Sequence, residues 1–128
     1  MAKNIIKLNR GDSYEFTVSI PDKKDATKNY FLTDFDVIYF ALLYPHQRFE
    51  DAIIIKGYDH TDHVIENGKN TGDILIKIEP KDTRQLAPGV YYYTVKLQCG
   101  GSLINAKDYD EPEEVRTIIE RTKFIIND

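Results

Sequence analysis

Two stretches of this chain alternate apolar and polar residues with a period of two, and this alternation limits the folds open to it. In residues 13–20, SYEFTVSI, every second residue is apolar, and residues 73–80, DILIKIEP, repeat the pattern with isoleucines. Period two places alternate side chains on opposite faces of an extended strand. We therefore expect strands with one face on a core and the other in water.

Further runs of β-branched and aromatic residues extend the count of strands. Residues 36–44, DVIYFALLY, are apolar on both faces and predict a central strand that ends before Pro45. The polar stretch 59–72 has the composition of a long loop, with a hairpin turn predicted at Asn67-Gly68. Other strands are predicted at residues 4–8, 51–58, 90–98 and 115–126, the last either as one long strand or as one with a bulge near Glu120.

The pattern as a whole predicts an all-β fold. No segment longer than a turn or two has apolar residues at helical spacing, so we expect almost no helix. About seven to eight short strands between turn-rich connections are typical of an antiparallel β-sandwich. The length of 128 residues fits one domain over residues 1–128.

The stretch 82–97, DTRQLAPGVYYYTVKL, could hold either a binding platform or part of the core. Alternation places Tyr91 and Tyr93 on the apolar face of the strand and Tyr92 on the other face. The Tyr91 ring would be buried near the start of the strand, where its hydroxyl can reach backbone groups of the preceding turn. We therefore interpret this strand as scaffold.

The pattern Leu86, Pro88, Gly89 and Tyr91 resembles the tyrosine corner of immunoglobulin-like sandwiches, where a tyrosine fastens a turn that crosses between sheets. The resemblance implies an immunoglobulin-like fold with Leu86 capping the core. The cysteine pair and tryptophan of antibody domains are absent, since the chain has one cysteine, Cys99, and no tryptophan. An antibody-type domain is thereby excluded, but the architecture is not.

A second resemblance rests on the order of segments along most of the chain. It is similar to the small immunoglobulin-like N-terminal domains of upper baseplate proteins in tailed phages and of related prophage proteins. The resemblance implies a non-enzymatic assembly module of a virion, made in the bacterial cytoplasm, with other virion proteins or copies of itself as partners. The segments, in order, are RGDSYEFTVSI, DVIYFALLY, GDILIKI, DTRQLAPGVYYYTVKL and TIIERTKFII.

Charge and hydropathy argue against several other classes of protein. The 17 basic and 21 acidic residues are interspersed, giving a net charge of −4 without the basic cluster that binding to a duplex requires. The N-terminal residues become polar too early for a signal peptide, and the apolar runs are too short to span a membrane. We expect neither nucleic acid nor membrane as a partner.

Chemical motifs are sparse. The sequence has no nucleophile elbow, no phosphate-binding glycine loop and no nucleotide fingerprint, so we predict neither an enzyme nor a cofactor. Residues 58–63, YDHTDH, supply Asp59, His60, Asp62 and His63, which are ligand types that zinc accepts. No remote ligand pair accompanies them; we assign no metal and leave binding by the two histidines open.

Two further surfaces are candidates for binding. Outward aromatic rings on one sheet would suit a carbohydrate-binding module, which is the alternative to the assembly module. An acidic run in the connection before the last strand would suit a basic partner. The rings are Tyr44, Phe49, Tyr58 and Tyr92, and the acidic run includes Tyr109, Glu111, Glu113 and Glu114.

If Tyr91 faces the core, Tyr91→Ala should lower the free energy of unfolding by about 3 kcal/mol or more, as large aromatic truncations in cores do. Urea denaturation of the two proteins measures this loss. An unchanged denaturation midpoint would refute the orientation of the strand.

Overall fold

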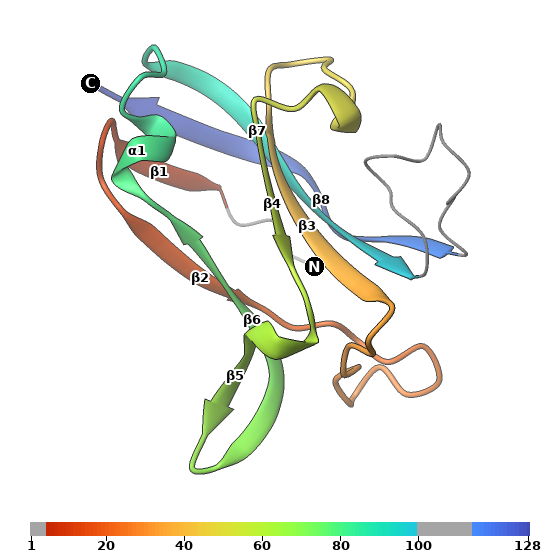
Figure 1. Ribbon diagram of the computed structural model, residues 1–128. Helices are drawn as coiled ribbons and strands as arrows, with labels where there is room; N and C mark the ends of the chain where they lie inside the picture. Colours follow the sequence, from red (N-terminus) through yellow and green to blue (C-terminus); the bar gives the residue numbers. More distant parts are fainter. Residues whose placement is uncertain (1–4, 100–113) are drawn as a thin grey trace.

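The alternating stretches form strands of two facing sheets in the computed structural model, which describes residues 5–99 and 114–128 (Figure 1). The larger sheet has the order β1-β8-β7-β3-β4, and the smaller has the order β2-β6-β5. These eight strands confirm the all-β sandwich. The larger sheet contains β1 (Ile6–Asn9), β3 (Asp36–Leu43), β4 (Ile54–Tyr58), β7 (Gly89–Cys99) and β8 (Glu114–Asn127), and the smaller contains β2 (Tyr14–Val18), β5 (His63–Glu66) and β6 (Lys69–Ile78).

Helical residues in the described part of the chain are limited to single turns, η1 (Phe49–Asp51), η2 (His60–Asp62) and α1 (Pro80–Thr83). The last of these lies where the chain crosses from β6 to β7, with proline at its start and a capping box between Glu79 and Asp82. The near absence of helix agrees with the lack of helical spacing in the sequence.

The first strand departs from the antiparallel pattern that the sequence predicted. It pairs with β8 in parallel, with Ile6 opposite Phe124, whereas the other pairs of strands are antiparallel. After β1 the chain turns through Gly11, whose φ is 86°, and enters the smaller sheet. The Gly11 amide donates to Thr83 Oγ1 at 3.0 Å, which joins this turn to α1. The first two strands are therefore not a hairpin.

The stretch 59–72 is mostly ordered as a hairpin, so its assignment as a long loop was wrong. Strands β5 and β6 pair across it, and the turn lies at the predicted Asn67-Gly68, with φ of 52° and 76°. Positive φ at both central residues is the requirement of the two-residue turn that matches strand twist. The short strand His63–Glu66 gained its structure from pairing with β6, which its local composition did not indicate.

A bulge interrupts β8 at the predicted place. Tyr93 faces Thr122 and Val95 faces Ile119, so one residue of β7, Thr94, opposes two residues of β8. The next pair, Lys96 and Thr117, shows a second shift, at Ile118. The extra residue of the first shift falls at Glu120–Arg121, so of the two predicted alternatives for this strand the one with a bulge near Glu120 is correct.

The core forms between the two sheets and centres on Tyr93, which is 1% exposed. Its ring packs against Phe16 of the smaller sheet at 5.9 Å between centroids and against Phe40 of the larger sheet at 5.9 Å. Phe124 of β8 closes the group at 6.3 Å. We call these four rings the Tyr93 cluster. It connects the two sheets in a chain whose single cysteine excludes an internal disulfide.

A second, smaller apolar cluster explains why residues 36–44 are apolar on both faces. Ala41 and Leu43 point away from the main core, and Phe49 of η1 folds over them and is 7% exposed. The loop that follows β3 therefore covers the outer face of this strand.

The turn before β7 contains the residues of the expected corner. Tyr91 is 4% exposed, and its hydroxyl donates to the Ala87 carbonyl at 2.6 Å. Leu86 packs against the main core, and Gly89, with φ of 154°, opens the strand after the exposed Pro88. Together with the crossing connections β2–β3, β4–β5 and β6–β7, this matches an immunoglobulin-like sandwich in which the sheet of β3, β7 and β8 gains β4.

If the Tyr93 cluster holds the sheets together, Phe40→Ala should lower the free energy of unfolding by about 3–5 kcal/mol, because it leaves a cavity in a closed core. Phe35→Ala is the matched control, since Phe35 is 77% exposed whereas Phe40 is 0% exposed. Chemical denaturation of both variants measures the difference. Equal losses would contradict the assignment of the core.

Candidate functional site

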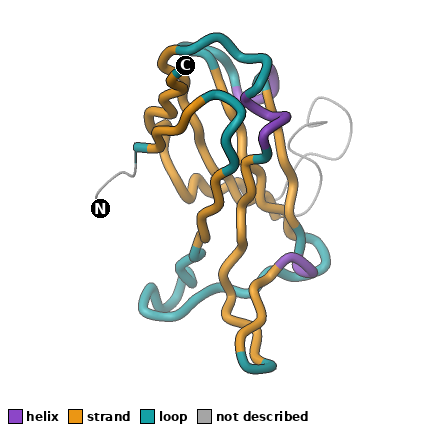
Figure 2. The backbone as a smooth tube through the Cα atoms, turned by 90° about the vertical axis from the view of Figure 1, so that its left-hand side faces the viewer, coloured by secondary structure: helices purple, strands orange, loops and turns teal. Residues whose placement is uncertain are grey.

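One end of the sandwich gathers the connections that are best placed for contacts with other molecules. Asp36 at the start of β3 pairs with Cys99 at the end of β7, which pairs with Glu114 at the start of β8. The connection from β2 to β3, residues 19–35, and the η2 turn lie at this same end, beside the β5–β6 hairpin (Figure 2). We call this region the loop end. In immunoglobulin variable domains the binding loops occupy the corresponding connections.

Asp36 fixes the end of the β2–β3 connection. Its carboxylate accepts from the Tyr30 hydroxyl at 2.5 Å and from the Thr33 amide at 2.9 Å, and the residue is 4% exposed. Burial acts to raise the pKa of Asp36, but hydrogen bonds from Thr33, Tyr30 and Cys99 outweigh it and hold the pKa below its usual range. Burial raises the pKa of Tyr30, and its bond to Asp36 raises it further.

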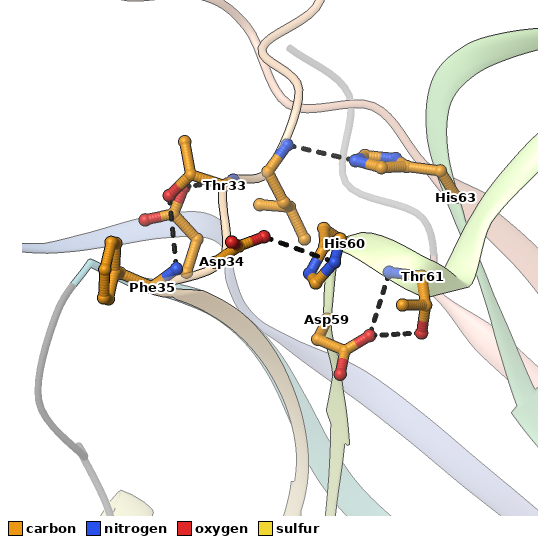
Figure 3. Close-up of polar contacts among 9 residues, drawn as sticks. Thr33, Asp34, Phe35, Asp59, His60, Thr61 and His63 are labelled. Atoms are coloured by element: carbon orange, nitrogen blue, oxygen red, sulfur yellow. Dashed lines mark hydrogen bonds and ion pairs between the residues drawn. The ribbon is translucent and has the colours of Figure 1, made fainter.

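His63 fixes the middle of the same connection (Figure 3). Its Nε2 accepts from the Leu32 amide at 3.0 Å, and its Nδ1 lies 3.4 Å from the Asp73 carbonyl, to which it can donate. Leu32 itself is 7% exposed and belongs to the main core. The β2–β3 connection is therefore held by the buried side chain of Leu32 and by hydrogen bonds to the side chains of His63 and Asp36.

The residues considered as metal ligands do not converge. His63 is engaged with Leu32, whereas His60 faces Asp34 at 3.4 Å (Figure 3). Asp59 and Asp62 form the capping box of η2. Within residues 5–99 and 114–128, no group of three or more ligating side chains could hold a metal ion. Their arrangement is explained by the local turn and its neighbours.

Large apolar side chains are exposed near Asp36 and His63, the residues that hold the β2–β3 connection. Phe35 is 77% exposed, Phe31 is 47% exposed and Ile65 on β5 is 60% exposed. The Phe31 ring lies 5.9 Å from that of His63, and Phe35 lies on the side of the loop away from His63 (Figure 3). Exposed aromatic rings on a fixed loop are typical of a protein-contact surface.

A cavity of about 350 Å³ opens at the loop end between the β2–β3 connection, the end of β7 and the start of β8. Burial and the nearby Asp36 carboxylate raise the pKa of the Cys99 thiol, so this thiol stays protonated near neutral pH. The lining residues are Asp22, Lys23, Lys24, Tyr30, Leu97, Cys99 and Arg116.

The four rings expected to form a sugar platform do not share one surface, so that prediction was wrong. Phe49 is buried beneath Lys96, whose Nζ lies 5.4 Å from the ring centroid. Tyr58 packs against the main core, and Tyr44 packs against Tyr91 at 5.5 Å. Tyr92 lines a separate depression with Pro45, His46 and Arg121. Period two alone could not show that β3 is followed by a loop that folds back over its sheet.

The acidic docking run falls mostly outside the described residues. Tyr109, Glu111 and Glu113 lie there, and Glu114 is described as the first residue of β8. That surface remains a prediction.

Comparison with other proteins leaves the family open. No protein-family model matches this chain, and no curated protein matches its sequence. In the part of the chain that the structure describes, no helix is both long enough and apolar enough to cross a membrane.

The sequence contained weak signals for the residues that form this site. Three aromatic residues, Tyr30, Phe31 and Phe35, interrupt a stretch that otherwise has the composition of a loop. Asp36 opens an apolar strand, where a carboxylate requires a partner. Their partners lie far along the chain or in a turn, so the pairing could not be inferred from spacing.

If Asp36 fixes the loop, Asp36→Asn should lower the free energy of unfolding at pH 7 by about 1–3 kcal/mol, because buried donors lose a charged acceptor. The folded pKa of Asp36 lies below the unfolded value of about 3.9, so this contribution is fully present above the unfolded value and is lost progressively as the pH falls from there through the folded pKa. The difference between wild type and variant should shrink below about pH 4.

Urea denaturation between pH 7 and pH 3 tests this prediction. Asp34→Asn is the control, since the Asp34 side chain is 80% exposed and should change stability little. A difference between wild type and Asp36→Asn that is constant over this range would contradict the assigned role.

Proposed function

We propose that this chain is a non-enzymatic assembly module of a phage or prophage virion, acting by protein–protein contact through its loop end. The observation that carries the proposal is the exposure of Phe35 and Phe31 on a connection fixed by Asp36 and His63. A rigid loop loses little conformational entropy on binding, so exposed rings on it favour association. Aromatic anchors contribute much of the binding energy in protein interfaces.

The edge of the smaller sheet adds a second route to assembly at the same end. Strand β5 pairs with β6 on one side, and Ile65 on it is 60% exposed. An edge strand offers backbone donors and acceptors to a strand from another chain. Of the other edge strands, β1 carries the exposed Lys7, which discourages such pairing.

The assignment to a virion rests on the resemblance of the segment order to immunoglobulin-like domains of baseplate proteins. On this proposal the chain is made in the bacterial cytoplasm and joins other virion proteins or copies of itself. No catalytic role is proposed, because Asp36 and His63 at the loop end are engaged in holding the loop.

The proposal predicts that the tagged chain, expressed in its native host during particle production, co-sediments with tail structures in a density gradient. Phe35→Ala should reduce its incorporation by about fivefold or more, as loss of an interface anchor does. Val90→Ala is the matched control, since Val90 is 47% exposed but lies at the opposite end of β7.

Recovery of the chain only in fractions without particles would reject the virion assignment. Equal incorporation of the Phe35 and Val90 variants would reject the loop end as the contact surface.

A further inference from the structure

The cavity at the loop end has an apolar interior. The half-buried Tyr30 and Cys99 form its accessible inner wall, and Leu97, which is 0% exposed, lies beneath them in the core. The Tyr30 hydroxyl is engaged with Asp36, and the Cys99 thiol lies near the same carboxylate. Both groups stay neutral at physiological pH because their pKa values are raised. The interior therefore offers an uncharged, partly aromatic surface to a ligand.

The rim of the same cavity is positively charged. Among the residues that line it, Lys23, Lys24 and Arg116 are cationic and Asp22 is anionic, and the Asp36 carboxylate lies behind Tyr30 and Cys99. This local excess is opposite in sign to the net charge of −4 for the whole chain. An anion is attracted to such a rim, and the attraction is strengthened where the site is partly closed off from water.

Arg116 is the best-placed cation on this rim. Its Nη2 donates to the Pro21 carbonyl at 2.9 Å, which holds the guanidinium between the β2–β3 connection and β8. An arginine has five N–H donors in a fixed plane, so a guanidinium held by one of them can still bind a carboxylate with others.

We propose that this cavity binds a small ligand that combines an apolar body with one carboxylate group. The apolar body packs against Tyr30 and Cys99, and the carboxylate pairs with Arg116 and Lys24 at the rim. The volume of about 350 Å³ is at the lower end of the range of small-molecule sites, so the ligand is a small acid. Asp22 on the rim disfavours a ligand with several negative charges. This binding does not depend on the proposed role in a virion.

Three probes that share one apolar body separate the contributions of charge and burial. They are 3-phenylpropanoate, 3-phenylpropan-1-ol and 3-phenylpropylamine, which are anionic, neutral and cationic at pH 7. Titrations of the full chain followed by ¹H–¹⁵N NMR should show shifts at Tyr30, Leu97 and Arg116. The anion should bind about tenfold more tightly than the alcohol, as for one charge-assisted contact, and the amine should bind most weakly.

The single cysteine gives a second readout, since Cys99 lines the cavity and is the one thiol in the chain. Saturating 3-phenylpropanoate should slow the alkylation of Cys99 by iodoacetamide, and the amine at the same concentration should not.

Two substitutions test the rim. Arg116→Gln and Lys24→Gln should each weaken binding of the anion about three- to tenfold while leaving binding of the alcohol unchanged. Lys24 is exposed, so its variant keeps the test valid if Arg116→Gln disturbs the fold. Lys81→Gln in α1, at the opposite end of the sandwich, is the control and should bind the anion like wild type.

Equal affinity for the three probes, or anion binding unaffected by both rim variants, would overturn the proposal. So would an absence of shifts at Tyr30 and Leu97 with millimolar 3-phenylpropanoate.

Discussion

Tyr93 packs against Phe16 from the smaller sheet and against Phe40 and Phe124 from the larger sheet, and the rest of the structure depends on this contact. Immunoglobulin domains of antibodies place a cysteine two residues after the corner tyrosine and bridge the sheets there with a disulfide. In this chain Tyr93 stands two residues after Tyr91, and a ring cluster connects the sheets. Burial of several rings can supply comparable stability without an oxidising environment.

Packing and hydrogen bonds connect the core to the loop end. Leu32 lies in the same apolar cluster as Tyr93, and it is the plug of the β2–β3 connection. Asp36 and His63 belong to strands that pack on this core, and each accepts a backbone amide from the connection. The exposed Phe31 and Phe35 therefore lie on a loop whose conformation is determined by the interior. Such a loop suits recognition of a partner, because ordering it costs little at the moment of binding.

Much of the fold followed from period-two alternation, because a strand with one buried face must obey it. The orientations of Tyr91 and Tyr93 were predictable for this reason, whereas the turn at Asn67-Gly68 was predictable from the preference of Asn-Gly for a two-residue hairpin turn. A bulge near Glu120 was one of two alternatives for the last strand. The parallel pairing of β1 with β8 was not, since it joins the two ends of the chain and leaves no local pattern.

The candidate site was less accessible from the sequence. Phe49 was expected on the surface, but the loop after β3 folds over its sheet and buries the ring. Phe35, in contrast, was not singled out by any sequence pattern, and it is 77% exposed. Side chains in loops take their environment from distant elements, and His63 and Leu32, 31 residues apart, illustrate this dependence.

The central claim is that the core holds the loop end in one conformation. Native-state hydrogen exchange of the Leu32 and Thr33 amides tests it most directly, because these donors bond to His63 and Asp36. The account predicts that both amides exchange slowly, with opening free energies that approach that of Phe40 in β3. Exchange at the rate of an unstructured peptide at both positions would contradict it.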